Sequence, residues 1–142
     1  MWESEERVLW NIKKLGMGIE CLLNRLLADM GLTASQGLVL LFILEHPGNT
    51  ICSTEIHKAF GVARPTISGI LKKLRQKGYI EFKTCEKDDR QKMIVSTPRA
   101  LELKPVLNDQ VRNMEQGVLT GLGAQEEQLL LHSLSGPGSF FQ

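Results

Sequence analysis

Apolar side chains recur with helical spacing in residues 64–76. Counted from the first of them, the apolar positions lie three, four and seven residues on, and they are Ile67, Ile70, Leu71 and Leu74. This spacing places them along one face of a helix. Pro65 falls in the first turn, where proline is tolerated, and Gly78 lies where a glycine commonly ends a helix. The pattern predicts a helix with one face committed to a core.

The opposite face of this predicted helix is polar. It carries cations, hydroxyls and one position without a side chain, namely Arg64, Thr66, Ser68, Gly69, Lys72, Lys73 and Arg75. Upstream, Ser53, Thr54 and Glu55 begin a shorter predicted helix, and these residue types suit a helix start through capping and the helix dipole. Gly61 then breaks the chain. Two short helices around a glycine turn indicate a helix-turn-helix.

An extended pattern follows the second helix. Residues 79–85 alternate apolar and polar side chains, and residues 93–97 offer a second extended run. The charged stretch between them, residues 86–92, exceeds a two-residue turn, so we expect a protruding hairpin tip. Ile51 and Cys52 are candidates for a short third strand. The expected lobe is therefore a helix-turn-helix followed by a small β-wing.

The segments on either side of this lobe are helical in pattern. Residues 8–30 place apolar side chains at near-heptad intervals, on a helix too long to bury its stripe inside one small domain. We expect this helix to pack against a second subunit. Thr33 and Gln36 form a capping-box pattern ahead of the apolar run 38–44, which should lie at the centre of the core.

A helical pattern returns after the wing. Thr97 and Pro98 make a good helix start, Pro105 should kink the helix that follows, and a last helix is expected over residues 125–134. The first and last helices together predict an intertwined dimer interface. The expected fold class is mainly α with a small β-wing (α+β).

Charge is unevenly distributed along the chain. The whole sequence holds 17 Lys and Arg against 16 Asp and Glu, but residues 53–92 hold 10 cations and 5 acids. That segment is +5, and the remainder, with 7 cations and 11 acids, is −4. A basic patch on an acidic body is the electrostatic footprint of a nucleic-acid binder. Lysines also decorate ordinary solvated helix faces, so the patch gains its meaning from its coincidence with the helix-turn-helix pattern.

Composition bounds the remaining classes of protein. At 142 residues the chain is expected to be a single domain, with no stretch long enough to cross a bilayer and no secretory signal at its acidic start. Three widely spaced cysteines, Cys21, Cys52 and Cys85, argue against a disulfide framework and for a reducing cytoplasm. We expect Cys52 to be buried and Cys85 to be more exposed.

Candidate catalytic and metal-binding chemistry is sparse. His46, His57 and His132 show no metal-ligand spacing, no glycine-rich phosphate loop is present, and nothing places a nucleophile beside a base, so we expect neither an enzyme nor a metal site. Cys21 has Arg25 one helical turn on, which could lower its thiol pKa and make it a redox sensor. A buried, inert cysteine is the commoner alternative.

Four motifs in register resemble a MarR-type bacterial transcriptional regulator. They are residues 32–36 (LTASQ), 61–68 (GVARPTIS), 74–80 (LRQKGYI) and 88–92 (DDRQK). One departure is Ala63, a poor N-cap where the family commonly has Ser or Thr. The resemblance implies a homodimer that inserts one recognition helix per subunit into the major groove of double-stranded DNA, with the wing on the backbone or minor groove.

The resemblance also implies residue roles. The recognition-helix positions would be Arg64, Pro65, Thr66, Ser68, Gly69, Lys72 and Lys73. Ser53 and Thr54 would contact DNA from the first helix of the helix-turn-helix. The wing positions would be Lys87, Asp88, Arg90 and Lys92, with Asp88 placed to hold Arg90 or its neighbours by a charge-assisted hydrogen bond.

The expected organisation is one MarR-like domain, residues 1–142. Residues 1–31 and 98–135 would form the dimerisation helices, residues 32–97 the DNA-binding lobe and residues 136–142 a tail. Repression of transcription, the commoner family behaviour, is expected, with no cofactor and with release by a small, for example aromatic, effector as an option. The alternative is a winged-helix module that binds protein, with its basic face merely solvated.

Overall fold

The computed structural model describes residues 8–46, 48, 50–85 and 88–119, and within them the chain is mainly helical with one small sheet. The elements in order are α1 (Val8–Leu27), the short 3-10 helix η2 (Ala28–Met30), α2 (Ala34–Glu45), β1 (Thr50–Cys52), α3 (Ser53–Phe60), α4 (Arg64–Gln76), β2 (Ile80–Cys85), β3 (Asp88–Ser96) and α5 (Pro98–Leu119). This confirms the expected fold class. The predicted helix over 125–134 and the tail lie outside the described residues.

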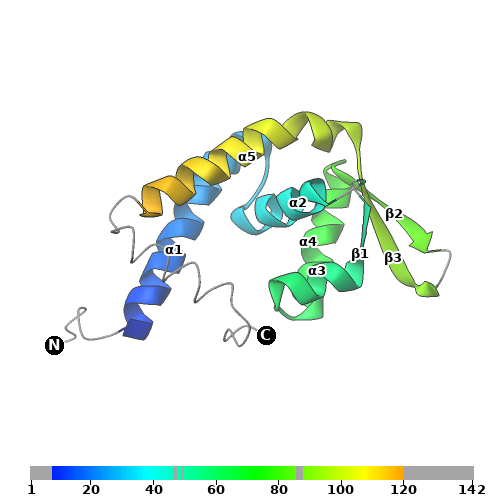
Figure 1. The fold of residues 1–142 in the computed structure, drawn as a ribbon, viewed down its shortest axis with the longest axis horizontal. Coiled ribbons are helices and arrows are strands. Elements are labelled where there is room, and N and C mark those ends of the chain that lie inside the picture. Colours follow the sequence, from blue (N-terminus) through cyan, green and yellow to red (C-terminus); the bar gives the residue numbers. More distant parts are fainter. Residues whose placement is uncertain (1–7, 47, 49, 86–87, 120–142) are drawn as a thin grey trace.

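Two parts of the molecule are visible in Figure 1. The lobe consists of α2, α3, α4 and the sheet. The arms, as we call α1 and α5, extend away from it, and α5 spans the distance from the sheet to α1. The hairpin of β2 and β3 projects from the lobe on the side opposite α1.

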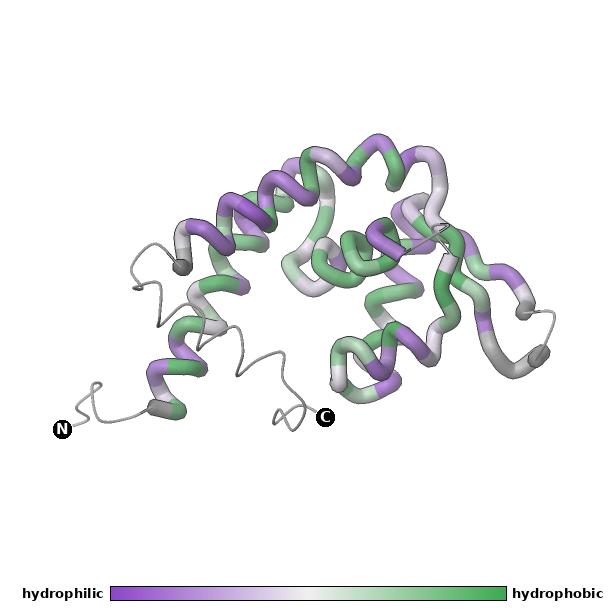
Figure 2. Tube along the Cα trace, in the orientation of Figure 1, coloured by the Kyte–Doolittle hydropathy of each residue, from purple (hydrophilic) through white to green (hydrophobic). Residues whose placement is uncertain are grey.

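The centre of the lobe is α2. Its start has the predicted capping box, in which Gln36 N donates to Thr33 Oγ1 and Thr33 N donates to Gln36 Oε1, both at 3.2 Å. Hydrophobic colour follows α2 over most of its length in Figure 2. Val39, Leu40 and Ile43 are fully buried. On the side toward α3, Phe42 meets Phe60 edge to face with ring centroids 5.4 Å apart.

The helix-turn-helix forms where the sequence predicts it. Gly61 takes a left-handed φ of 63° and ends α3, a conformation that glycine adopts without steric cost. Ile56 of α3 and Ile67 and Leu74 of α4 then meet in the core. The start of α3 differs from the expectation, because its N-cap residue is Cys52, which makes no side-chain capping hydrogen bond.

The sheet has strand order β1-β3-β2, and both pairings are antiparallel. The expected short strand at residues 51–52 is present as β1. The expected tip at residues 86–92 is wrong, because β3 already begins at Asp88 and pairs there with Cys85. The register shifts between Thr84 and Cys85, a bulge-type irregularity. Charged side chains do not prevent pairing in a solvated hairpin, since the ladder uses only backbone groups.

α1 buries few of its apolar side chains, whereas α5 buries Ala100, Leu107 and Met114. In α1 only Leu23 and Leu27 among the described side chains are buried. α5 begins as predicted, since Thr97 Oγ1 accepts from Ala100 N at 3.4 Å and the Thr97 carbonyl accepts from Leu101 N at 3.1 Å. The helix then continues through Pro105 to Leu119.

Within the described residues, no single helix is long and apolar enough to span a membrane. Residues Leu9–Met30 and Ala34–Glu45 meet the length and hydropathy conditions only as a pair, and that pair is bent by 71°.

Candidate nucleic-acid interface

The outward face of α4 carries every recognition-helix residue that the sequence predicted. All seven are exposed: Arg64, Pro65, Thr66, Ser68, Gly69, Lys72 and Lys73. The inward face holds Ile67, Leu71 and Leu74, which are 1%, 4% and 0% exposed. Because this apolar stripe fixes the rotation of the helix about its axis, the polar face is held outward. Ser53 and Thr54 are half-buried in the first turn of α3.

The amino-terminal end of α4 is not covered by a capping side chain. Its N-cap residue is Ala63, as the sequence indicated, and the Ala63 carbonyl accepts from Thr66 N at 3.0 Å and Ile67 N at 3.3 Å. Pro65 has no backbone N–H to satisfy. The exposed helix start, with its partial positive charge and the Arg64 guanidinium, favours an anionic group at this position.

Gly69 lies in the middle of the exposed face. Among the described residues, no heavy atom lies within 4 Å of the point where a Cβ would be. Glycine in an exposed helix interior costs about 1 kcal/mol relative to alanine. Packing against the described residues therefore does not explain the glycine, and the open position gives an external surface room to approach the helix backbone closely.

A basic hollow of about 390 Å³ lies between α4 and the wing, with Lys72, Arg75 and Lys92 among its lining residues. The Phe82 ring also lines this hollow. The Arg75 guanidinium carbon and the Lys92 Nζ are each 5.1 Å from its centroid, which is cation–π distance. This stacking orients two cations between α4 and the hairpin.

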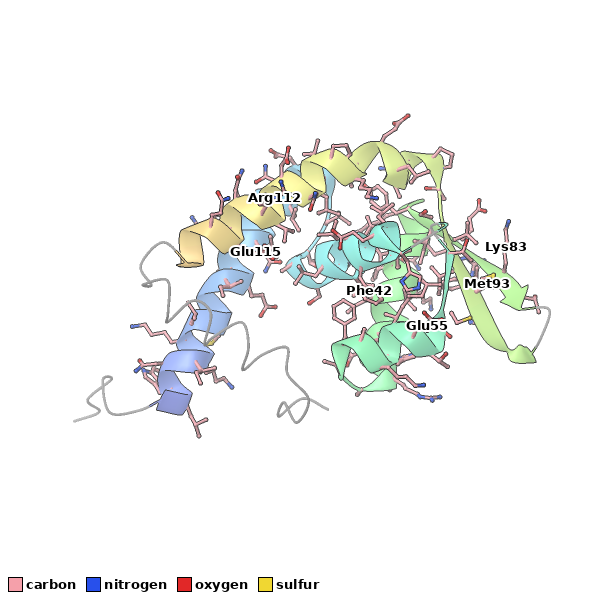
Figure 3. The ribbon with its side chains drawn as sticks, viewed as in Figure 1. Phe42, Glu55, Lys83, Met93, Arg112 and Glu115 are labelled. Atoms are coloured by element: carbon pink, nitrogen blue, oxygen red, sulfur yellow. The ribbon has the colours of Figure 1, made fainter. Side chains whose placement is uncertain are left out.

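The hairpin of β2 and β3 carries charged side chains outward from the rest of the lobe. Figure 3 shows Lys83 and Met93 on the two strands, where they are cross-strand partners, with the Lys83 side chain extending away from the molecule. Asp88 and Arg90 belong to β3, but their side chains, like the whole of Lys87, lie outside what the structure describes. The expected contact between Asp88 and Arg90 stays a prediction.

Two members of this surface were not among the predicted site residues. Arg75 is exposed on α4, and Phe82 is half-buried beneath it. The helical spacing had placed Arg75 on the polar face, and the strand alternation had marked Phe82 as apolar. The signal was present for each residue alone, but their stacking required knowledge of how the wing folds back on α4.

The cysteines and histidines are dispersed. Cys21 is exposed on α1, and Cys52 is half-buried rather than buried as expected. His46 Nε2, at the carboxyl end of α2, lies 3.1 Å from Glu55 Oε2 in the first turn of α3, and both side chains are partly exposed. Among the described residues, no group of three or more His, Cys, Asp or Glu side chains is arranged to hold a metal ion.

The helices around Gly61, the exposed polar face of α4 and the three-stranded sheet define a winged helix-turn-helix protein. A model of the MarR family matches residues 30–91, which begin at the last residue of η2 and cover most of the lobe. Over these residues the chain is similar to the MarR family, and the whole described structure has the winged helix-turn-helix fold. This agrees with the expectation that it is not an enzyme.

Individual proteins extend the match beyond the lobe. The uncharacterized HTH-type transcriptional regulator YybA of Bacillus subtilis is 24% identical over 123 residues, which are 87% of this chain and 81% of that protein. The S. aureus MepR–DNA complex superposes with a TM-score of 0.83 at 22% identity, over 91% of this chain and 94% of that one. A putative MarR family transcriptional regulator from Listeria monocytogenes, complexed with 26mer DNA, superposes with a TM-score of 0.80 at 21% identity. The superposition covers 91% of this chain and 85% of that one.

Proposed function

We propose that this protein is a sequence-specific DNA-binding regulator that acts as a homodimer on a pseudo-palindromic operator. The observation that carries the proposal is the outward face of α4, on which seven exposed polar, cationic or small residues lie opposite the buried Ile67, Leu71 and Leu74. An α-helix fits the major groove of B-DNA, where the base edges can be distinguished. Two proteins with this fold, MepR and the putative MarR family regulator from Listeria monocytogenes, were solved with DNA, which supports a nucleic-acid partner.

Different positions on the surface suit different contacts. Arg64, Thr66 and Ser68 lie at the amino-terminal end of α4, the end that a recognition helix commonly directs at base edges. Lys72 and Lys73, farther along, and Ser53 and Thr54 of α3 suit phosphate oxygens, which position the protein without reading sequence. The wing residues Lys87, Asp88, Arg90 and Lys92 would follow the backbone into the minor groove. An arginine there reads groove shape.

The dimer is proposed from the first arm. α1 exposes large apolar side chains, including Leu9, Ile12, Leu15 and Leu22, whose exposed fractions run from 84% to 45%. A shallow apolar groove of about 410 Å³ lies beside them and reaches Met114 of α5. A contiguous apolar surface of this kind marks an interface. Residues 1–31 and 98–135 would then form the dimerisation region, and residues 32–97 the DNA-binding lobe.

Repression is the mode of regulation that we propose. A dimer seated on both half-sites excludes other proteins from the same stretch of DNA. A small-molecule effector that favours a dimer with the wrong spacing between its two α4 helices would release it, because a ligand shifts an equilibrium toward the state that it binds better.

The test is selection of bound fragments from random duplex DNA by the purified protein at two salt concentrations, followed by sequencing. The proposal predicts enrichment of an inverted repeat whose half-sites lie about one helical turn, or a multiple of it, apart. Weak, salt-sensitive binding with no enriched sequence would contradict it. That result would favour the protein-interaction alternative.

A further inference from the structure

The junction between α1 and α2 is held by a set of local hydrogen bonds. Gly31 takes a φ of 71° and ends η2. Ala34 N donates to Asn24 Oδ1 at 2.6 Å, which ties the start of α2 to the last turns of α1. The capping box of Thr33 and Gln36 completes the set. The junction therefore fixes the direction of the first arm relative to the core helix of the lobe.

The carboxyl-terminal end of α4 is bound to this junction by two side chains. Lys77, the C-cap residue of α4, donates from Nζ to Gln36 Oε1 at 2.6 Å and to the carbonyl of Gly31. Tyr79, which is 4% exposed, donates from its hydroxyl to the Met30 carbonyl at 2.9 Å. Hydrogen bonds from a charged donor are among the stronger ones in proteins. The partners are 41 to 49 residues apart in sequence, so these contacts join separate parts of the fold.

The second arm is bound to the same short segment. Arg99 Nη1 donates to the Lys77 carbonyl at 2.6 Å, and the Arg99 guanidinium lies 4.7 Å from the centroid of the Tyr79 ring. Thr97 Oγ1 donates to the Gly78 carbonyl at 2.7 Å, and Thr97 N donates to the Tyr79 carbonyl at 3.0 Å. Residues 77–79 thus connect the end of α4 to both arms, near the point where α5 leaves the sheet in Figure 1.

We propose that Lys77 is a positioning residue for DNA recognition, which fixes the angle of α4 relative to the arms and thereby the separation of the two α4 helices in the dimer. The role rests on the proposed function, because only a dimer on DNA makes use of that separation. Lys77 suits it because one ammonium group donates to two oxygens of the α1–α2 junction while its own carbonyl accepts from α5.

The geometry makes the separation sensitive to this contact. A helix of 13 residues is about 20 Å long, so a tilt of about 5° at its carboxyl end moves its amino end by about 2 Å. Equal tilts in both subunits change the separation by roughly the 3.4 Å rise of one base pair. Loss of the Lys77 contacts should therefore appear as a relaxed or shifted preference for half-site spacing.

The first arm of the test needs no DNA. Spin labels are attached at Ser68→Cys on α4 and Arg25→Cys on α1, in a background carrying Cys21→Ser, Cys52→Ser and Cys85→Ser, and labelled chains are diluted with unlabelled protein. Lys77→Met keeps the aliphatic stem but cannot donate. Ser68 lies about 14 Å along the helix from Lys77, so a tilt of about 5° predicts a distance distribution that is broader or shifted by about 1 Å. Lys77→Arg should restore the parent distribution, and Lys58→Met, at an exposed lysine of α3, should leave it unchanged.

A Lys77→Met distribution identical to that of the parent overturns the proposal. If thermal unfolding shows that Lys77→Met does not fold, Tyr79→Phe replaces it in the same measurement, since it removes only the hydroxyl that binds Met30. An unchanged distribution in Tyr79→Phe would then be the contrary result.

The second arm of the test uses the inverted repeat selected by the parent. The ratio of affinities for the selected spacing and for a spacing one base pair longer should fall roughly fivefold to tenfold in Lys77→Met. Affinity for a single half-site should be unchanged. Equal weakening on every duplex would contradict a positioning role. If the parent selects no sequence, the proposed function fails, while the label distances still decide whether Lys77 positions α4.

Discussion

α1 and α4 are both amphipathic helices, but they turn opposite faces to solvent. α4 buries Ile67, Leu71 and Leu74 and exposes its polar side. α1 exposes Leu9 and Leu15, among other large apolar side chains, over its first half. The described residues cover the apolar face of α4, whereas they leave much of the apolar face of α1 exposed. The difference teaches that the periodicity of a helix predicts its faces, while only the fold shows which face meets solvent.

The contrast indicates two separate roles within 142 residues, recognition by α4 and assembly through α1. The core is centred on α2 and includes side chains from both arms, and α4 packs on it with its polar face outward. Among the described residues, the first arm has too few neighbours to cover its apolar stripe, as expected of a helix that packs against another subunit. Variants in the two regions should therefore fail in different ways, and the following variants are chosen to break or sharpen that contrast.

The largest effect on folding is expected in the core of the lobe. Leu74→Ala removes a fully buried side chain and should lower the free energy of unfolding by about 2 to 5 kcal/mol. Leu15→Ala, at a side chain that is 50% exposed, makes the same chemical change on the first arm. Its cost should be small in the monomer and should grow with protein concentration. Denaturant titrations at two protein concentrations measure the loss of stability in both variants. Equal losses at the low protein concentration would contradict the contrast between α4 and α1.

The first arm should fail in assembly rather than in folding. Leu15→Glu places a charge on the exposed apolar stripe and should weaken self-association at least about tenfold, because an unpaired charge is costly to bury at an interface. Light scattering across a dilution series measures the shift. Val62→Glu is a matched control, since Val62 is 46% exposed in the turn between α3 and α4. A dimer that tolerates Leu15→Glu would show that this stripe is not the interface.

Arg64 tests whether the outward face of α4 reads sequence. Arg64→Ala should cost about 1 to 3 kcal/mol on the selected duplex if the guanidinium contacts a base edge, and it should relax the preference at one position of each half-site. Affinity for unrelated duplexes should fall less. Competition titrations with selected and scrambled DNA distinguish a base contact from a phosphate contact. Equal losses of affinity on both duplexes would indicate that Arg64 contacts phosphates.

Lys72 provides the contrast on the same helix. Lys72→Ala should weaken binding to all duplexes similarly and reduce the slope of log affinity against log salt concentration by about 1 if its ammonium group neutralises a phosphate. Lys58→Ala, an exposed lysine of α3, is the control for a general loss of charge. A salt slope equal to that of the parent would place Lys72 outside the contact surface.

The smallest expected effect is that of Gly69→Ala, which should change stability and DNA affinity in opposite directions. Gly69→Ala should raise the free energy of unfolding by up to about 1 kcal/mol, because alanine favours the helix and nothing described lies within 4 Å of its Cβ position. If DNA approaches the helix backbone at this point, the same variant should bind DNA more weakly. Greater stability together with parental affinity would mean that Gly69 has no role at the interface.

Much of the lobe could be predicted from the sequence, because its signals are local. The apolar spacing after Ile67, the glycine at 61 and the capping box at Thr33 each act within a few residues, and the structure has all three features. The predicted bounds of the wing tip were wrong, because strand pairing depends on a partner strand rather than on side-chain polarity. The contacts of the Lys77 ammonium group could not be predicted, since they join residues more than 40 positions apart.

The most direct test of the account is a comparison of three proteins, the parent, Leu15→Glu and Arg64→Ala, on the selected inverted repeat and on a single half-site from it. The account predicts that Leu15→Glu binds the half-site like the parent but loses the gain in affinity from the second half-site. Arg64→Ala should lose affinity for both duplexes while remaining a dimer. If Leu15→Glu retains the full gain from the second half-site, or if Arg64→Ala binds both duplexes like the parent, the assignment of assembly to α1 and of recognition to α4 is contradicted.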